Sequence, residues 1–246
     1  MRMMMRLFAL VALVMAAGET QAAGGTGPEL PHKDWSFEGV RGHWDKDELY
    51  RGYTVATQVC MACHSFKYVS HRDLMRVGFT EAEVQTLAKA LNMDINAKLK
   101  TGMDDATAKE TFGKIPPDLS LMNKARHGGA DYVYALTHGY QADSATIVRY
   151  LPNGVPAGAY FNLYYPGHAI AMPNPLPSDG LVTYHDGTKA TVDQMAHDVA
   201  VFMQWTAEPE RIDRQHMGVY VLIYLVIFTV LAYLTKRVIW KDVKKH

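Results

Sequence analysis

The chain has 246 residues, of which 48% are hydrophobic and 20% charged, and its 25 basic residues balance 25 acidic ones. This length suits one large domain or two small ones, and it is enough to bury a core. The composition excludes a disordered chain and a collagen, and two cysteines are too few for a disulfide scaffold. The zero charge balance gives no support for nucleic-acid binding.

The N-terminus has the three parts of a secretory signal peptide. Met1–Arg6 is basic, an apolar run follows over Leu7–Ala17, and small residues stand at Ala22 and Ala23. We therefore predict a signal peptide over residues 1–22, cleaved after Ala22 or Ala23. The alternative is a short membrane anchor, but the apolar run is too short to span a bilayer.

The C-terminus predicts a membrane anchor. The nineteen residues Met217–Thr235 carry no charge, and as a helix they would reach about 28 Å, close to the hydrocarbon thickness of a bilayer. The alternative, a buried core helix, is disfavoured because the stretch is apolar on all faces. Five Lys and Arg residues follow against one acid, so the positive-inside rule places the tail in the cytoplasm. We predict an exported domain over 23–212, an anchor over 213–237 and a cytoplasmic tail over 238–246.

The exported part is acidic once the two ends are set aside. It retains 23 acidic and 18 basic residues, about five negative charges in excess. This favours a cationic partner and disfavours nucleic acid, although solubility alone also accounts for it.

Three segments begin with a capping pattern, a Thr or Asp followed three residues later by Glu or Gln, and continue with apolar residues at helical spacing. They start at Asp45, Thr80 and Thr191. The first predicts a helix over about 46–62 that leads into the cysteines. The third should end near Glu208–Pro209, ahead of the anchor.

The rest of the exported part predicts one short helix and one long loop. The helix is expected over 131–138. Residues 152–180 contain six prolines and four glycines, which exclude a long helix or a central strand and indicate a long ordered loop. The fold class we expect is therefore mostly α, with long loops wrapped around a site.

Cys60-Met61-Ala62-Cys63-His64 is the C-x-x-C-H signature of covalent c-type haem attachment. Two thiols three residues apart on a helix lie on one face, so both can add to the vinyl groups of one porphyrin. His64 then falls under the iron. Two alternatives stay open: a thioredoxin-like C-x-x-C, which would begin a helix rather than end one, and a zinc site, for which no second cysteine pair exists.

A haem iron used for electron transfer favours a methionine thioether opposite the histidine. Of the methionines outside the predicted signal, Met195 and Met203 lie on the apolar face of a predicted helix, where core packing is expected. Met172 stands in Ala169-Ile170-Ala171-Met172-Pro173 inside the proline-rich loop, and a rigid loop can hold a thioether against an iron. Met172 is the favoured ligand from the residues alone, with a core methionine left open.

The ordered set of motifs resembles the cytochrome c1 family, the haem subunits of quinol:cytochrome c oxidoreductase (the cytochrome bc1 complex). The matching pieces, in the family's order, are Trp35-Ser36-Phe37-Glu38-Gly39, Arg51-Gly52-Tyr53, Val59 to Ser65, Pro116 to Ser120, Ala125 to Val133, Ala169 to Pro173 and Trp205 to Glu210. The resemblance implies a cytochrome-c-like haem domain with one C-terminal transmembrane helix.

The family also implies site residues. One haem c is bound covalently through Cys60 and Cys63, and its iron is ligated by His64 and Met172. Arg126 is implied to pair with a haem propionate, which suits a partly buried carboxylate. Tyr132 and Pro117 are implied to line the haem pocket, with plain core packing as the alternative. No residue is catalytic in the sense of making or breaking substrate bonds.

The resemblance implies an electron-transfer subunit of quinol:cytochrome c oxidoreductase, linked to respiratory proton translocation. Its partners would be cytochrome b, a Rieske iron–sulfur protein, a soluble or membrane-tethered cytochrome c and membrane lipid. Its place would be the inner membrane of a bacterium, in a single pass, with the haem domain in the periplasm. The alternatives are an anchored cytochrome c that serves another redox complex, such as an oxidase, and an exported thiol–disulfide oxidoreductase.

One part of the sequence departs from the family. The stretch ahead of Pro116 is often strongly acidic in the family, where it is thought to meet a basic cytochrome c. Here residues 81–110 carry six acids against four lysines, so the charge of the docking surface is weak.

Overall fold

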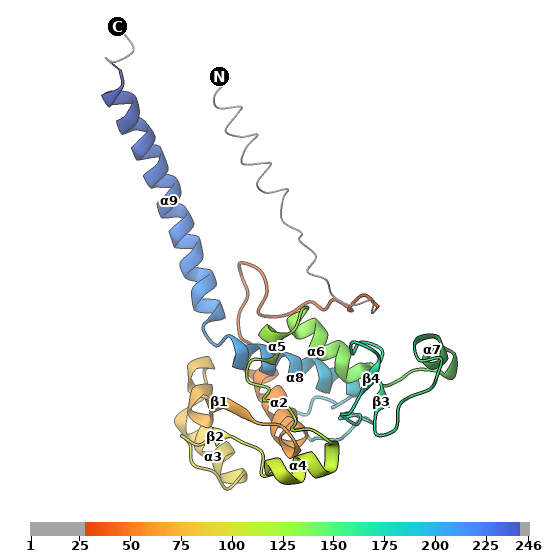
Figure 1. Ribbon diagram of the computed structural model, residues 1–246. Coiled ribbons are helices and arrows are strands. Elements are labelled where there is room, and N and C mark those ends of the chain that lie inside the picture. The colour runs from red at the N-terminus through yellow and green to blue at the C-terminus, as the bar shows by residue number, and fades with distance from the viewer. Residues whose placement is uncertain (1–27, 242–246) are drawn as a thin grey trace.

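The computed structural model describes residues 28–241, so the predicted signal peptide and the end of the basic tail lie outside the described residues. Helix dominates this part of the chain, which confirms the mostly α fold class (Figure 1). The α-helices are α2 (Lys46–Gln58), α3 (Glu81–Ala90), α4 (Asp105–Phe112), α5 (Met122–Ala125), α6 (Gly129–His138), α7 (Ser144–Tyr150), α8 (Val192–Ala207) and α9 (Arg211–Ile239). The shorter elements are the 3₁₀ helices η1 (Cys60–Ala62) and η2 (His71–Val77) and the strands β1 (Phe66–Ser70), β2 (Lys98–Leu99), β3 (Tyr160–Phe161) and β4 (Ala169–Ile170).

The strands form two small antiparallel pairs. β1 pairs with β2, with Phe66 opposite Leu99 and an irregularity before Ser70. β3 pairs with β4, with Tyr160 opposite Ile170. The second pair lies inside the predicted loop of residues 152–180, which is otherwise irregular.

Side-chain caps start the predicted helices. The Asp45 carboxylate accepts a hydrogen bond from the Glu48 backbone N–H at 2.9 Å and so begins α2. The Glu48 carboxylate does not return the bond, because it accepts instead from the Ser36 hydroxyl. The Thr80–Glu83 pair, by contrast, forms the full reciprocal box at the start of α3. The capping pattern thus predicts where these helices begin, and tertiary contacts decide whether the box closes.

Helix α8 is the centre of the core, with α2 on one side and α5 and α6 on the other (Figure 1). Met195 and Met203 are buried on it, as expected for core methionines. At the crossing with α2, the Arg51 Nε donates to the fully buried Asp198 carboxylate at 3.0 Å. Gly52 lets the two helices approach, because a Cβ there would lie 2.1 Å from the Asp198 carbonyl oxygen.

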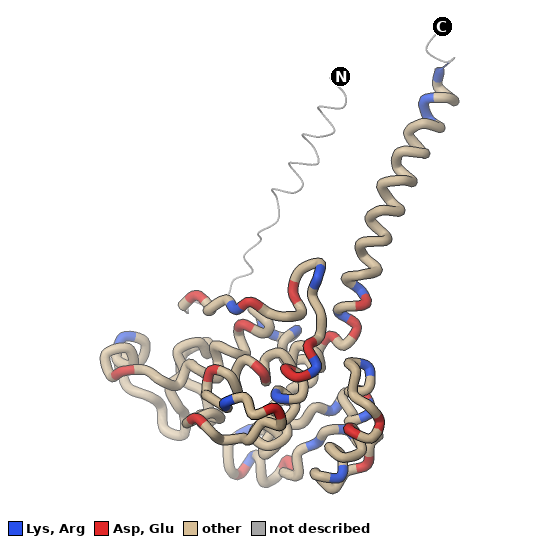
Figure 2. Tube along the Cα trace, turned by 180° about the vertical axis from the view of Figure 1, so that it is seen from behind, with Lys and Arg blue, Asp and Glu red and all other residues tan. Residues whose placement is uncertain are grey.

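The chain leaves the core at Glu208–Pro209, as the sequence predicts, and then forms α9. This helix is 29 residues long, about 43 Å at the rise of an α-helix, and it projects from the domain as a single rod (Figure 1). It is long and apolar enough to cross a membrane. Charged residues cover the domain but leave most of α9 free, and basic residues return near its end (Figure 2).

Candidate functional site

The C-x-x-C-H motif occupies a tight turn at the end of α2. The helix ends at Gln58 rather than near residue 62, and Cys60–Ala62 forms the 3₁₀ turn η1. A tightened last turn is common at helix C-termini, and side chains three residues apart are eclipsed in a 3₁₀ helix. The Cys60 and Cys63 thiols therefore lie on one side of the turn, as a two-point attachment to one porphyrin needs. Both thiols are free.

Segments from later in the chain hold this turn in place. The Thr101 hydroxyl donates to the Ala62 carbonyl at 3.3 Å, and the Thr101 N–H donates to the Ser65 hydroxyl at 3.0 Å. On the other side, the Leu119 N–H donates to the Ser65 carbonyl at 2.8 Å. The attachment turn thus lies between the segment around residue 101 and the segment 116–120.

The imidazole of His64 is fixed by the Pro117 carbonyl. Its Nδ1 lies 2.8 Å from that oxygen, and a carbonyl can only accept, so Nδ1 carries the proton. Nε2 then has a free lone pair, and it makes no hydrogen bond within residues 28–241. Burial lowers the pKa of His64, with the Pro117 carbonyl opposing it, so the ring is neutral near pH 7. An imidazole that is oriented by a carbonyl and carries no proton on Nε2 is ready to bind a metal ion through that nitrogen.

The electrostatics of the cysteines disfavour a thiol–disulfide oxidoreductase. Burial raises the pKa of the Cys60 thiol to about 12. Redox-active C-x-x-C thiols instead have lowered pKa values at helix N-termini, whereas Cys60 follows the C-terminus of α2. A part-buried thiol that stays protonated suits a thioether-forming residue.

Met172 follows β4 in a loop that is docked on α6. The Tyr140 hydroxyl donates to the Met172 carbonyl at 3.0 Å. Asn162, fully buried, donates from Nδ2 to the Leu136 carbonyl at 2.7 Å, and its Oδ1 accepts the N–H groups of Tyr164 and Tyr165. Asn162 therefore ties the β3–β4 hairpin to α6, and with it the loop that carries Met172.

Arg126 and Tyr132 belong to the same neighbourhood. Burial raises the pKa of Tyr132, and the nearby positive charge of Arg126 opposes this shift. The pKa of Tyr140 is raised by burial and further by Tyr132. Tyr132 is buried and Arg126 is exposed, an arrangement that leaves the guanidinium available to an anionic group.

The predicted site residues thus form two groups. Cys60, Cys63, His64 and Pro117 make one, around the attachment turn. Arg126 at the end of α5, Tyr132 on α6 and Met172 in the loop after β4 make the other. Among the described residues, no hydrogen bond joins the two groups. The sequence did not predict the roles of Asn162 and Tyr140. The only available signal was the long proline-rich loop, which needs contacts elsewhere in the domain to fix its position.

The fold and the attachment turn define a haem cytochrome with a helix able to anchor it in a membrane. The Cytochrome C1 family model matches residues 35–243. The chain is 39% identical to cytochrome c1 of Rhodospirillum rubrum, over 96% of this chain and 97% of that protein. It is 36% identical to cytochrome c1 of Blastochloris viridis, over 100% and 99%. The cytochrome b/c1 of Bradyrhizobium diazoefficiens is 34% identical over 96% of this chain, which spans 39% of that longer protein.

The chain belongs to the cytochrome c1 family. Membership makes it a haem cytochrome subunit of the cytochrome bc1 complex, which is a redox subunit of an oxidoreductase complex.

Proposed function

We propose that this chain carries single electrons from a Rieske iron–sulfur protein to a c-type cytochrome within the quinol:cytochrome c oxidoreductase. Its haem domain faces the periplasm of a bacterium, α9 spans the inner membrane once, and the basic C-terminus is cytoplasmic. The electron transfer is linked to respiratory proton translocation by the complex as a whole. The chain itself makes and breaks no substrate bonds.

The observation that carries this proposal is the bond between His64 and Pro117. It sets the proton on Nδ1 and leaves Nε2 to bind a metal, at the residue that the C-x-x-C-H motif assigns to the iron. The donor set fits haem c: two thiols on one side of a turn, an oriented neutral imidazole and a thioether in a held loop. Thiol and imidazole from one turn are the attachment set of a c-type haem.

The residues would divide the work of holding the haem. Cys60 and Cys63 would hold it through thioethers, and His64 and Met172 would ligate its iron. Arg126 pairs with a propionate, and Tyr132 and Pro117 line the pocket. When bound, the haem would supply a one-electron iron couple, whose potential the identity of the two iron ligands and the burial of the group would set.

The proposed partners are based on a related protein, on α9 and on the family resemblance. A related protein named cytochrome b/c1 supports direct contact with a cytochrome b, and α9 supports contact with lipid. The family resemblance supports the Rieske protein as donor and a soluble or membrane-tethered cytochrome c as acceptor.

The first test is a reduced-minus-oxidised visible spectrum of the tagged chain, purified in mild detergent from its own membranes. A c-type band together with b-type bands is expected, because the chain should travel with cytochrome b. Haem should also stay on the chain in a denaturing gel and be lost from a double Cys60→Ala, Cys63→Ala variant. A c-type band without b-type bands would contradict the assignment to this complex, and no haem band would contradict the whole proposal.

The distal ligand is tested by Met172→Leu. The variant should keep covalent haem while its midpoint potential falls by on the order of 100 mV or more, because thioether ligation raises the potential. Met75→Leu, at an exposed methionine of η2, is the matched control and should leave the potential unchanged. An unchanged potential in Met172→Leu would remove Met172 as the ligand.

A further inference from the structure

A short loop, residues 36–43, stands beside the start of α9 and ends in a tight turn. The Gly42 N–H donates to the Gly39 carbonyl at 3.1 Å, which closes a β-turn with Val40 and Arg41 as its two central residues. Gly39 has a φ of +72°, in the left-handed region that favours glycine. The turn therefore presents Val40 and Arg41 in a fixed arrangement at the tip of the loop.

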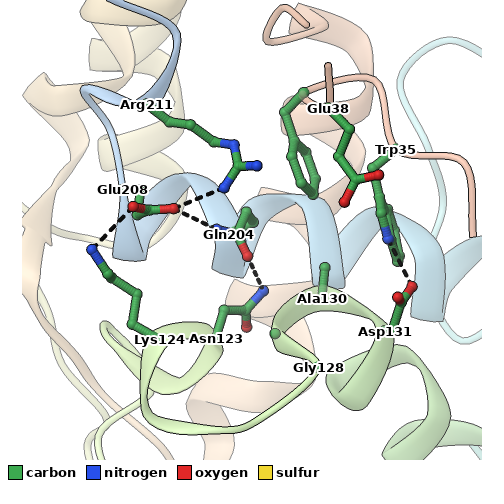
Figure 3. Close-up of a pocket in the computed structure, with 12 residues that line it drawn as sticks. Trp35, Glu38, Asn123, Lys124, Gly128, Ala130, Asp131, Gln204, Glu208 and Arg211 are labelled. Atoms are coloured by element: carbon green, nitrogen blue, oxygen red, sulfur yellow. Dashed lines mark hydrogen bonds and ion pairs between the residues drawn. The ribbon is translucent and has the colours of Figure 1, made fainter. Parts of the chain in front are cut away.

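The base of the loop is fixed to the domain and to α9. The His43 N–H donates to the Ser36 carbonyl at 2.9 Å. The Phe37 ring stacks on Trp35 with the ring centroids 5.7 Å apart, and the Arg211 guanidinium lies over the Phe37 ring at 5.2 Å. Figure 3 shows Trp35 and Arg211 on two sides of the pocket between the loop base and the junction of α8 and α9. The loop is thus held in a fixed position relative to the first turn of α9.

The loop base lies at the depth of lipid headgroups if α9 spans the membrane. The Gln215 Nε2 donates to the Phe37 carbonyl at 3.5 Å. Gln215 comes about 3 Å of helix rise ahead of Met217, where the uncharged stretch begins. The headgroup layer extends roughly 5–8 Å on each side of the hydrocarbon core, so Phe37 lies within it. From there the loop rises beside the first turns of α9 (Figure 1, Figure 2), and its tip points toward the hydrocarbon boundary.

The two tip residues have side chains that suit a membrane interface. Val40 is 73% exposed, more than any other large hydrophobic residue of the described domain outside α9. Arg41 is exposed as well, and it forms no ion pair within residues 28–241. A single exposed valine is ordinary on a soluble surface. At headgroup depth, however, a valine next to an arginine can enter the acyl boundary while the guanidinium stays with the phosphates.

The one acid of the loop does not oppose this arrangement. Glu38 lines the pocket at the junction of α8 and α9, and Figure 3 shows its side chain directed into that pocket. Arg41 does not line the pocket. The positive charge of Arg41 therefore dominates the tip.

We infer that the tip of loop 36–43 is a second membrane contact of this chain, in which Val40 enters the lipid interface and Arg41 binds lipid phosphates. A phospholipid surface fits better than a protein, because two side chains are far fewer than the roughly 800 Å² that each partner buries in an ordinary protein interface. A bilayer offers phosphates and acyl chains at every position, so the loop needs no shaped site. With α9 as the first contact, the loop holds the haem domain in one orientation above the membrane. The inference rests on the proposed membrane crossing of α9.

The test is spin-label accessibility in the full haem-loaded chain, reconstituted alone in nanodiscs of phosphatidylethanolamine and phosphatidylglycerol. Because Cys60 and Cys63 would be bound as thioethers, Val40→Cys would carry the only free thiol. A label at residue 40 should collide more often with lipid-soluble oxygen than with a water-soluble nickel chelate. Val148→Cys, at an exposed valine of α7 on the far side of the domain from α9 (Figure 1), is the matched control and should show the reverse.

The role of Arg41 is tested in the same labelled chain. Arg41→Gln should raise the ratio of undocked to docked loop by about fivefold, the effect of one basic residue at an anionic surface. Nickel collisions at residue 40 should rise accordingly. Arg149→Gln, at an exposed arginine of α7, is the matched control and should leave them unchanged. No rise in Arg41→Gln would overturn the assignment of Arg41 to lipid phosphates.

A label in the middle of α9, from Val226→Cys, separates the two proposals. If that label is open to nickel, the membrane crossing is overturned and the inference with it. If it is shielded while a label at Val40 is as open to nickel as one at Val148, only the inference is overturned. A label at Val40 that is shielded in the assembled complex but open in the chain alone would overturn lipid as the ligand and assign the loop to a partner subunit.

Discussion

Replacing Gly52 by alanine tests whether the crossing of α2 and α8 positions the attachment turn. A Cβ at residue 52 would lie 2.1 Å from the Asp198 carbonyl oxygen and 2.7 Å from the Phe202 Cβ, against 3.4 Å or more in ordinary contact. The two helices must therefore separate by about 1 Å, and the buried pair of Arg51 and Asp198 must stretch. Overpacking of this kind destabilises a protein by about 1–3 kcal/mol and occasionally more. The higher helix propensity of alanine offsets about 1 kcal/mol of that loss.

We expect the free energy of unfolding to fall by about 2 kcal/mol in total, because the new Cβ would clash with backbone rather than with a flexible side chain. For a chain of this size that lowers the apparent Tm by roughly 4–8 °C. The assay is thermal unfolding followed by circular dichroism, with haem absorbance recorded in parallel. Gly218→Ala, inside α9, is the matched control, since a Cβ there meets nothing within 4 Å. Its Tm should equal or exceed that of the wild type, because alanine favours helix over glycine. A Gly52→Ala variant as stable as that control would refute the close crossing.

The other predictions concern the anchor junction, the Met172 loop and the docking surface. Burial raises the pKa of Glu208, but its hydrogen bonds outweigh this and hold the pKa at about 2. Its stabilisation is thus complete above the unfolded pKa of about 4.3 and is lost as the pH falls toward 2. Glu208→Gln should cost about 1–2 kcal/mol at pH 7, since the partners are part-exposed, and its Tm should depend less on pH between 5 and 2. An identical pH dependence would contradict this. Asn162→Ala should lower the fraction of Met172-ligated haem, seen as a loss of the near-infrared charge-transfer band, and an unchanged band would contradict the docking role. Reduction of a basic cytochrome c should slow by less than about tenfold between low and physiological salt, whereas strongly complementary surfaces gain about 10–10³-fold; a steeper fall would contradict a weakly charged surface.

Features set by neighbouring residues were predictable from the sequence. The caps at Asp45, Thr80 and Thr191 start three helices where expected, because the side chain and the N–H it accepts from are three residues apart. The end of α8 at Glu208–Pro209 was predictable for a similar reason, since proline cannot continue a helix. The attachment motif is local as well, although its turn is a 3₁₀ helix rather than the last turn of α2.

Two helices were missed because their caps lack the full box. Asp104 starts α4 and Asp143 starts α7, each accepting from the N–H of a threonine three residues on. The capping-box pattern requires Glu or Gln at that third position, so it matches neither of these two caps. An aspartate followed by a threonine three residues later was the signal available.

The two halves of the candidate site differ in whether a local sequence motif marks them. His64 is oriented by one carbonyl, that of Pro117. The C-x-x-C-H motif alone predicts that His64 is the iron ligand. Met172 has no comparable attachment motif beside it. Its position depends on the hydrogen bond from Asn162 to the Leu136 carbonyl and on the hydrogen bond from Tyr140 to the Met172 carbonyl. Sequence periodicity carries no information about contacts of that kind. Met172 was therefore favoured by its place in a rigid proline-rich loop, by the exclusion of core methionines and by the family resemblance. The burial of Met195 and Met203 supports that exclusion, and the loop on α6 supplies the physical reason that a methionine outside the core can be held in a fixed position.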